Sequence, residues 1–438
     1  MPVMLVCASR EDDPPGTVAL VLRAARVLLL TVGVLAPVGL VGLVVAVLSG
    51  RAAARRLAWP RLVALLMRLG PTFVKAGQVL GTRRDLLPPG LCDELATLQD
   101  SVIPLTADRT REALAAVYGA ELDTLFAEVD YEPVASGSVA CVYRARLTSG
   151  REVALKLRRP GIERVMRQDL DLMRRGAALM ARLPLFRGIP VMPVVVSMCD
   201  AVLGQLDFER EAASLDRLRA DLSVVPRVWV PKVVPSACRP RCIVMEFIHG
   251  LDIDAPSRCS DASRRKFASS GLTAIYEMLF VNGFVHCDMH PGNLYFTESA
   301  QVVVLDAGFS VQLSERLRLL FADFFMNMAI GDGDKCAAIV VESSADVGAD
   351  ADVAGFLARM ADLVRRSHGL PAREFSLIAF ATEMFDLQRR HGIHAAPELI
   401  FPLLSLLVIE GTIRELDPDV DFQALARPVL MKGRFGSR

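Results

Sequence analysis

A short polar run in the second half of the chain restricts the fold more than any other feature. The run reads HCDMHPGN from His286 to Asn293, and Asp306-Ala307-Gly308 follows it after a strand-like VVVLD. Phosphoryl-transfer sites place a proton-accepting aspartate, a metal-binding asparagine five residues later and a metal-binding aspartate on the next hairpin. Asp288, Asn293 and Asp306 have this spacing. It predicts Asp288 as a catalytic residue and Asn293 and Asp306 as ligands of Mg²⁺. The alternative is a chance match in a polar loop, but the later Asp-x-Gly stands after a strand, as the motif requires.

A lysine upstream has the sequence context of a phosphate-binding strand. It ends Val153-Ala-Leu-Lys156, which follows a predicted hairpin. Lys156 is therefore expected to hold the α and β phosphates of ATP. Glu211, in the helical segment QLDFEREA, is the expected partner of Lys156, and both are assigned catalytic roles. Glu209 is the competing choice, although charged residues on such a helix are usually solvated.

Two further segments are expected to contact the nucleotide. The stretch ASGSVACV keeps one glycine where a phosphate-covering loop normally has three, so the usual glycine-loop argument fails and an alanine- and serine-rich loop takes its place. Met245-Glu-Phe-Ile matches the segment that joins two lobes and pairs with adenine through its backbone. The residues predicted to bind nucleotide here are Ala135, Ser136, Gly137, Ser138, Val142, Glu246 and Ile248.

Composition excludes one class of partner and favours a reducing setting. Fifty basic and fifty acidic residues give a formal net charge of zero, so the chain lacks the excess of positive charge that is typical of a nucleic-acid binder. Nine cysteines are an odd number without zinc or disulfide spacing. Cys238 and Cys242, in CRPRC, are interpreted as ordinary reduced thiols.

An uncharged stretch near the N-terminus predicts membrane attachment. No charged residue occurs from Val27 to Ser49, long enough for a helix rising about 1.5 Å per residue to cross a hydrocarbon core of roughly 30 Å. Arginines are more frequent after the stretch than before it, which predicts a single-pass cell-membrane protein with a cytoplasmic C-terminal bulk. The alternatives are a re-entrant or interfacial segment kinked at Pro37, and a cleaved signal peptide. The apolar segment Leu399–Ile409 is shorter and is expected to be a buried helix.

The remaining pattern divides the chain into four parts. Helices are expected from Leu57 to about Phe126, a small antiparallel sheet from Tyr131, helices at Ile162–Leu183 and Gln205–Leu222, a strand from Arg241, and mostly helix after Ser260. The predicted parts are 1–56 (tail and membrane helix), 57–130 (helical extension), 131–250 (first lobe) and 251–438 (helical second lobe).

These motifs together resemble those of the UbiB family of atypical kinases. The most specific is LGPTFVKAGQVLGTRRDLLP, similar to the family's KxGQ signature, with Lys75 and Gln78 on one helix face. The alanine-rich loop, HxDxHPGN and IEGTIRELDPD add to a similarity that runs from about Leu69 to Leu425.

The resemblance implies an α+β, two-lobed, protein-kinase-like fold with an N-terminal helical KxGQ extension. It implies ATP and Mg²⁺ as cofactors, and a small-molecule or lipid substrate in place of a protein. It further implies a role in isoprenoid quinone or other lipid metabolism, a membrane as partner, and quinone-biosynthesis proteins as further partners. Lys75 and Gln78 would then lie over the nucleotide site.

Two departures from the family pattern keep a second function open. Gln205 stands where the family usually has a glutamate. Any inhibitory contact between Lys75 and this position, called the latch below, then becomes a weaker neutral hydrogen bond or moves to Asp207. Ala307 replaces the usual phenylalanine of Asp-Phe-Gly. Both slightly favour a nucleotide- and lipid-sensing pseudokinase scaffold. The intact set of Lys156, Asp288, Asn293 and Asp306 argues against it, so an active kinase or ATPase remains the leading hypothesis. A choline- or aminoglycoside-type kinase is the third alternative, and the KxGQ signature argues against it.

Overall fold

The computed structural model describes residues 17–81, 89–95, 97–98, 103–182, 191–252, 255–289, 293–297, 299–370 and 374–436. The chain forms two compact units. The first unit consists of Met1–Thr82, Leu87–Asp207 and Arg239–Cys242, and the second of Arg83–Leu86, Phe208–Cys238 and Ile243–Arg438. The four-part division of the chain remains a prediction.

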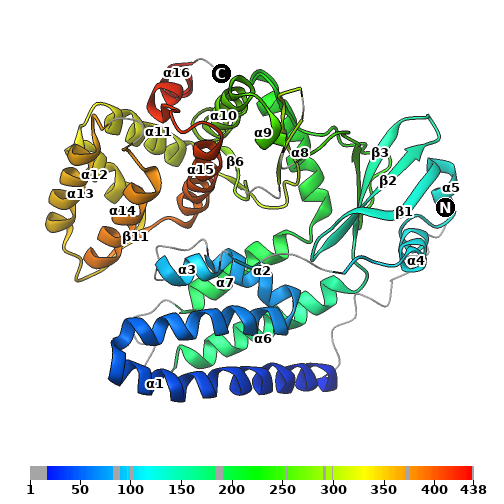
Figure 1. Ribbon diagram of the computed structural model, residues 1–438, viewed down its shortest axis with the longest axis horizontal. Coiled ribbons are helices and arrows are strands. Elements are labelled where there is room, and N and C mark those ends of the chain that lie inside the picture. The colour runs from blue at the N-terminus through cyan, green and yellow to red at the C-terminus, as the bar shows by residue number, and fades with distance from the viewer. Residues whose placement is uncertain are drawn as a thin grey trace, which may run out of the picture. The chain divides into compact units, whose positions relative to one another are not determined.

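A small antiparallel sheet forms one part of the first unit (Figure 1). Three of its strands are β1 (Phe126–Ser136), β2 (Ala140–Leu147) and β3 (Glu152–Arg158), and the fourth, β5 (Cys242–Glu246), has its first residue in this unit. Gly150, at φ +85°, closes the β2–β3 hairpin in a conformation that favours glycine. Helix α4 (Ala107–Tyr118), followed by the short η1 (Gly119–Glu121) and α5 (Leu122–Leu125), precedes the sheet. The buried Thr110 Oγ1 and Tyr143 hydroxyl lie 2.9 Å apart and join α4 to β2.

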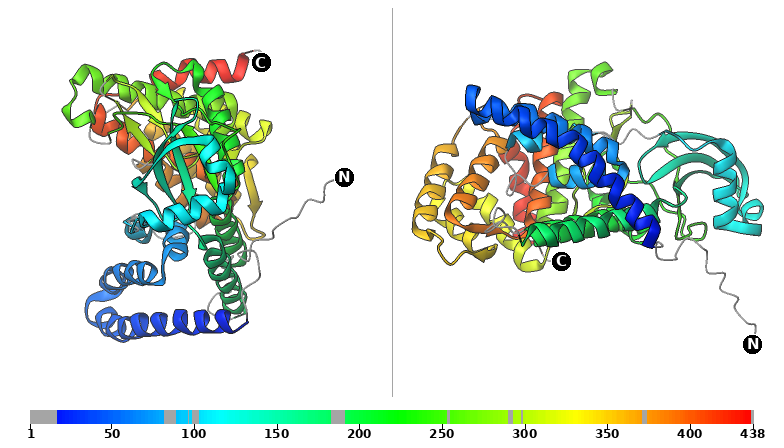
Figure 2. Two further views of the ribbon diagram at one scale, coloured as in Figure 1. Left: turned by 90° about the vertical axis from the view of Figure 1, so that its right-hand side faces the viewer. Right: turned by 90° about the horizontal axis from the view of Figure 1, so that it is seen from below.

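Five helices form the other part of the first unit. They are α1 (Thr17–Leu69), α2 (Pro71–Gly81), α3 (Pro89–Leu95), α6 (Ile162–Met180) and α7 (Val191–Gly204). Arg23 Nη2 donates to the Leu69 carbonyl at 2.8 Å, although the two residues are 46 positions apart. A straight helix of that length would span roughly 70 Å. Helix α1 therefore doubles back on itself, as both Figure 1 and the left view of Figure 2 show.

The N-terminal arm of α1 packs against protein. Arg23 binds the buried Asp169 of α6 through Nε at 2.7 Å and Nη2 at 2.8 Å. Val27, Leu30 and Val34 pack on the cluster formed by Leu65, Leu69 and Phe73.

The predicted single-pass helix at Val27–Ser49 is therefore not supported. Among the helices that the structure describes, none is long and apolar enough to cross a membrane. At the start of the stretch, apolar side chains that the sequence assigns to lipid are partly used for packing within the first unit.

The second unit combines short strands with a large helical layer. Its first part contains α8 (Phe208–Asp221), η3 (Leu222–Val224), β4 (Val228–Trp229), all of β5 after Cys242, α9 (Ala255–Arg258), α10 (Asp261–Tyr276) and the π-helix η4 (Glu277–Asn282). Four short strands follow: β6 (Phe284–His286), β7 (Leu294–Phe296), β8 (Val302–Val304) and β9 (Ser310–Gln312). Strand β8 pairs with β7 and β4, while β6 pairs with β9.

The helical layer completes the second unit (Figure 1). It consists of α11 (Glu315–Ala329), α12 (Gly333–Glu342), α13 (Val353–Ser367), α14 (Leu377–His391), α15 (Pro397–Leu416) and α16 (Phe422–Phe435), with the two-stranded pair β10 (Ser344–Val347) and β11 (Ile393–Ala395). Helix α15 contains the whole of the predicted buried helix Leu399–Ile409, which is confirmed.

The IEGTIRELDPD segment has a structural role in this layer. Glu410 is fully buried and accepts hydrogen bonds from the backbone amides of Leu377 at 3.1 Å and Ile378 at 3.0 Å. Arg414 Nε donates to the same carboxylate at 2.9 Å. The first amides of a helix lack internal partners and attract negative charge, so Glu410 holds the start of α14 against α15.

Candidate functional site

Short hairpins position the three residues of the polar run and the Asp-x-Gly motif. Asp288 lies two residues after β6, Asn293 immediately before β7, and Asp306 two residues after β8. The Leu305 amide donates to the Asn293 carbonyl at 3.0 Å, which continues the β7–β8 pairing toward Asp306. His290, Pro291 and Gly292 lie outside the described residues. The structure therefore brings Asp288, Asn293 and Asp306 to one end of these strands.

His286 joins the two aspartates. Its fully buried ring accepts a hydrogen bond from the Asp288 amide at Nδ1, at 3.1 Å, and its Nε2 lies at the carbonyl of Asp306. Because Nδ1 accepts, the ring proton is on Nε2, which donates to that carbonyl. The Ser405 hydroxyl of α15 donates to the His286 carbonyl at 2.8 Å. Sequence reasoning assigned this histidine no role, although its place two residues before Asp288 was the available signal.

The asparagine and the second aspartate are oriented by their own hydrogen bonds. Asn293 Nδ2 donates to the Asp288 carbonyl at 2.9 Å and to Asp288 Oδ2 at 3.2 Å. Asp306 has a left-handed backbone, at φ +56°, and its Oδ1 accepts from the Gly308 amide at 2.8 Å. Aspartate adopts this region more readily than most residues because its short side chain bonds nearby backbone.

This donor set fits a magnesium ion. The bonds from Asn293 Nδ2 leave the amide oxygen as the group suited to bind a metal, and Asp306 adds a carboxylate. No group of three or more histidine, cysteine, aspartate or glutamate side chains within the described ranges could hold a metal. Mg²⁺ does not need such a cage, because it usually takes one or two protein ligands together with substrate phosphates and waters.

Glu211 lies beside the Asp-x-Gly motif. It stands in the first turn of α8 and is 2 % exposed, whereas Glu209 is exposed. A Cβ placed on Gly308 would lie 3.5 Å from Glu211 Oε2 and 3.2 Å from Asp306 Oδ1, so this glycine sits close to both carboxylates. Lys156 belongs to the first unit, and its pairing with Glu211 remains a prediction.

Three predicted nucleotide-binding residues form one row across the sheet of the first unit. Ala135 on β1 is the register partner of Val142 on β2, and Val142 is the partner of Lys156 on β3. The adjacent row contains Cys141 and Leu157, both completely buried. Side chains of successive residues point to opposite faces of a sheet. Ala135, Val142 and Lys156 therefore share the face opposite the buried one.

An arginine not identified from the sequence holds the loop between β1 and β2. Arg159 donates from Nε to the Gly137 carbonyl at 2.8 Å and from Nη2 to Ser136 Oγ at 2.7 Å. Its backbone amide donates to the Val139 carbonyl at 2.9 Å. Ser138, in the middle of this loop, is buried. These bonds restrain a loop whose amides are predicted to approach phosphates.

The KxGQ residues lie in the middle of α2. Lys75 and Gln78 are partly buried, and Gln78 Nε2 donates to the Leu98 carbonyl at 3.1 Å. A Cβ on Gly77 would lie 2.5 Å from Leu98 Cδ1 and 2.8 Å from Leu66 Cδ1. The glycine of the signature is therefore required by close packing within the first unit. The predicted contact of Lys75 and Gln78 with nucleotide remains a prediction.

The predicted adenine-binding segment begins in the last two residues of β5 (Cys242–Glu246). Glu246 Oε2 accepts from Trp229 Nε1 and from the Lys232 amide, each at 3.2 Å. The Glu246 amide donates to the Lys232 carbonyl at 2.8 Å, and Ile248 is buried. The Glu246 side chain thus holds the segment in place, consistent with a role for its backbone in ligand contact.

The fold and these motifs define a kinase-like α+β protein, and comparisons identify its family. Residues 97–340 match the ABC1 atypical kinase-like domain and residues 360–421 match the UbiB helical domain. The chain belongs to the UbiB family of atypical kinases.

Similar proteins extend over most of the chain. A protein of Azotobacter vinelandii named "Probable protein kinase UbiB" is 33 % identical over 386 residues, covering 86 % of this chain and 72 % of the relative. One of the same name from Aeromonas hydrophila is 34 % identical over 370 residues, covering 83 % and 68 %. A Mycobacterium tuberculosis protein solved in complex with erythromycin has a TM-score of 0.60 at 21 % identity, covering 90 % of this chain and 99 % of that one, which shows a shared fold.

Proposed function

We propose that this protein is a membrane-attached atypical kinase or ATPase that uses Mg-ATP in support of isoprenoid quinone or other lipid metabolism. The observation that carries the proposal is the His286 bridge between the Asp288 amide and the Asp306 carbonyl. A single buried ring couples the predicted catalytic loop to the predicted metal-binding aspartate. Such positioning accounts for most of the catalysis in phosphoryl transfer.

Each residue then has a defined chemical task. Asp288 accepts the proton of the attacking water or substrate hydroxyl, and Asn293 orients its carboxylate through the bond to Oδ2. Asn293 and Asp306 hold Mg²⁺, which supplies charge neutralisation at the phosphates. Lys156 pairs with the phosphates from the sheet, next to Val142 in the row that faces the ligand. The family resemblance supports small-molecule or lipid substrates in preference to proteins, and quinone-biosynthesis proteins are the proposed partners.

An apolar stripe on α1 supports attachment to a membrane. Five large side chains of the N-terminal arm are each more than half exposed: Val21, Leu22, Leu28, Leu29 and Val32. They recur at helical spacing beside Arg26. A helix with one packed face and one exposed apolar face is suited to lie in the interface of a bilayer.

A scaffold with little turnover is the second candidate. Ala307 is buried, so the apolar side chain that normally sets the position of the metal-binding aspartate is a single methyl group here in place of a phenyl ring. Phe309, two residues later, instead packs edge-on against Phe401 of α15 with ring centroids 4.9 Å apart. Measured phosphate release separates the two candidates, because a scaffold binds nucleotide without turnover.

The nucleotide site is tested by thermal unfolding with Mg-ADP. Asp306→Asn keeps a residue that tolerates the left-handed backbone but removes the charge that would bind metal. We expect the stabilisation by Mg-ADP to fall to the level seen with ADP and chelator. Asp350→Asn, at an exposed position of the same unit, is the control and should keep the full shift. Equal Mg-dependent shifts in both variants would refute the assignment.

A further inference from the structure

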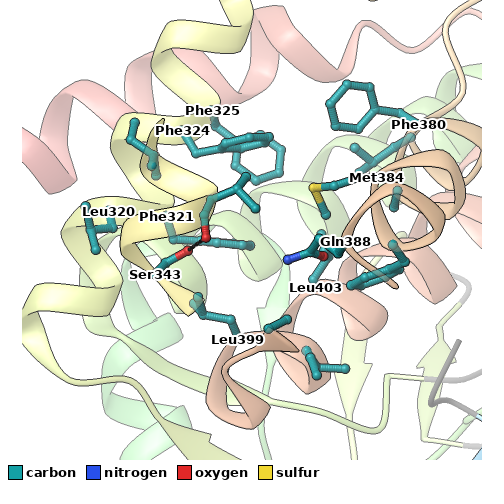
Figure 3. Close-up of a pocket in the computed structure, with 17 residues that line it drawn as sticks. Leu320, Phe321, Phe324, Phe325, Ser343, Phe380, Met384, Gln388, Leu399 and Leu403 are labelled. Atoms are coloured by element: carbon teal, nitrogen blue, oxygen red, sulfur yellow. Dashed lines mark hydrogen bonds between the residues drawn. The ribbon is translucent and has the colours of Figure 1, made fainter. Parts of the chain in front are cut away.

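The second unit contains an apolar cavity among helices α11, α12, α14 and α15 (Figure 3). The space open to the centres of water-sized spheres is about 60 Å³, several times the roughly 10–15 Å³ that one buried water needs. Most of the wall is aromatic or aliphatic, as in Phe321, Phe324, Phe380, Met384 and Leu403. None of its lining residues belongs to the candidate nucleotide site.

One polar group in the wall lacks a partner. Gln388 of α14 is 5 % exposed and its side chain lies among the apolar residues of the cavity (Figure 3). Within the described part of the chain, Gln388 Oε1 accepts no hydrogen bond. Leaving a buried polar atom unpaired costs about 1–3 kcal/mol. A group that is both buried and unpaired calls for an explanation.

Water is a poor partner for this oxygen. A buried water needs two to four polar contacts, and apolar cavities of this kind stay dry. A second polar side chain in the wall, that of Ser343, already donates from its hydroxyl to the Val340 carbonyl at 3.1 Å. A ligand that brings its own hydroxyl can satisfy Gln388 and also cover the apolar wall. Burial of apolar surface then supplies most of the affinity.

We propose that this cavity binds a small, mostly apolar molecule carrying one hydroxyl group, which donates to Gln388 Oε1. A hydroxyl suits the site because it can donate to the amide oxygen or accept from the amide nitrogen. The inference does not depend on nucleotide binding, because no residue is shared with the nucleotide site. The two proposals therefore fail independently.

Cyclohexanol and cyclohexane form a matched pair of probes, since they differ by the hydroxyl alone. Ala381 lines the cavity, and Ala381→Leu should fill it. Ala379→Leu, at an exposed position of the same helix, adds the same side chain outside the cavity. At about five times its dissociation constant, cyclohexanol should raise the Tm of the Ala379→Leu control by about 2–4 °C relative to Ala381→Leu. The comparison cancels the bulk effect of the alcohol.

Gln388→Leu tests the hydroxyl separately. The unsubstituted protein should be stabilised more by cyclohexanol than by cyclohexane, and Gln388→Leu should respond equally to both. A cooperative thermal transition without ligand shows that each variant is folded, and Mg-ADP shifts are measured separately, so a failure of nucleotide binding is seen apart from a failure of this site. Equal cyclohexanol shifts in Ala381→Leu and Ala379→Leu would overturn the proposal, as would a retained preference for the alcohol in Gln388→Leu. If Ala381→Leu does not fold, the Gln388→Leu comparison decides the question alone.

Discussion

The glycine of the KxGQ signature offers a direct test of the packing in the first unit. A methyl group on Gly77 would approach Leu98 Cδ1 to 2.5 Å and Leu66 Cδ1 to 2.8 Å. Overpacking of this kind costs about 1–3 kcal/mol. Replacing a helical glycine by alanine also gains about 0.5–1 kcal/mol from reduced backbone entropy. Gly176→Ala is the matched control, because Gly176 lies in α6 with nothing within 4 Å of its added methyl.

The two substitutions should have different effects on the free energy of unfolding. Gly176→Ala should stabilise the first unit, while Gly77→Ala should be neutral or destabilising. The helix-propensity gain cancels between them, which leaves the overpacking cost of about 1–3 kcal/mol. Thermal unfolding should show this as a Tm difference of roughly 2–4 °C for each kcal/mol. If Gly77→Ala raises the Tm as much as Gly176→Ala does, the close approach of α2 to Leu66 and Leu98 is wrong.

Three further predictions concern the latch, the membrane and pH. Gln205→Glu should lower steady-state phosphate release, because a charge-assisted bond to Lys75 is about twice as strong as a neutral one. If Gln205→Glu leaves phosphate release unchanged while Lys75→Ala raises it greatly, the latch does not involve position 205. Replacing both Leu22 and Leu29 by glutamate should reduce flotation with lipid vesicles without unfolding the protein, since both side chains are exposed; undiminished flotation would exclude the stripe. Burial raises the pKa of Asp221 above its usual 3.8, so the stability associated with its protonated form is present at low pH and lost as pH rises through that pKa. Asp221→Asn should therefore raise the Tm near neutral pH, with a gain that shrinks toward pH 3.8 in unfolding scans; a gain independent of pH would contradict the burial effect.

Elements with strong local signals were predictable from the sequence, and weakly marked ones were not. The helices near Ile162 and Gln205 correspond to α6 and α8, and the sheet begins at Phe126, five residues before the predicted start at Tyr131. Helix α7 was missed because its segment has neither a clear capping residue nor helical periodicity. The pair β10–β11 was missed because strands of three or four residues are too short for an alternating pattern.

The amino-acid sequence by itself determined the family and the order of the candidate site residues. The reason is that motif spacing is a local property: Asp288 and Asn293 both lie between β6 and β7, and Asp306 follows β8, the next strand along the chain. Hydropathy is local too, which is why it assigned Val27–Ser49 to lipid without regard to the protein surface that meets its first turns.

Tertiary structure alone decided how these groups are held. Arg23 meets Asp169, Ser405 meets His286 and Glu410 meets Leu377 across 146, 119 and 33 positions of sequence, respectively. No periodicity or composition encodes such pairs, because they form only when separate elements pack together. The same holds for Gly77, which has no room for a side chain because two leucines on other segments pack against it. The residues predicted to carry the chemistry could be identified from the chain, whereas the residues that hold them in place appeared only in the fold.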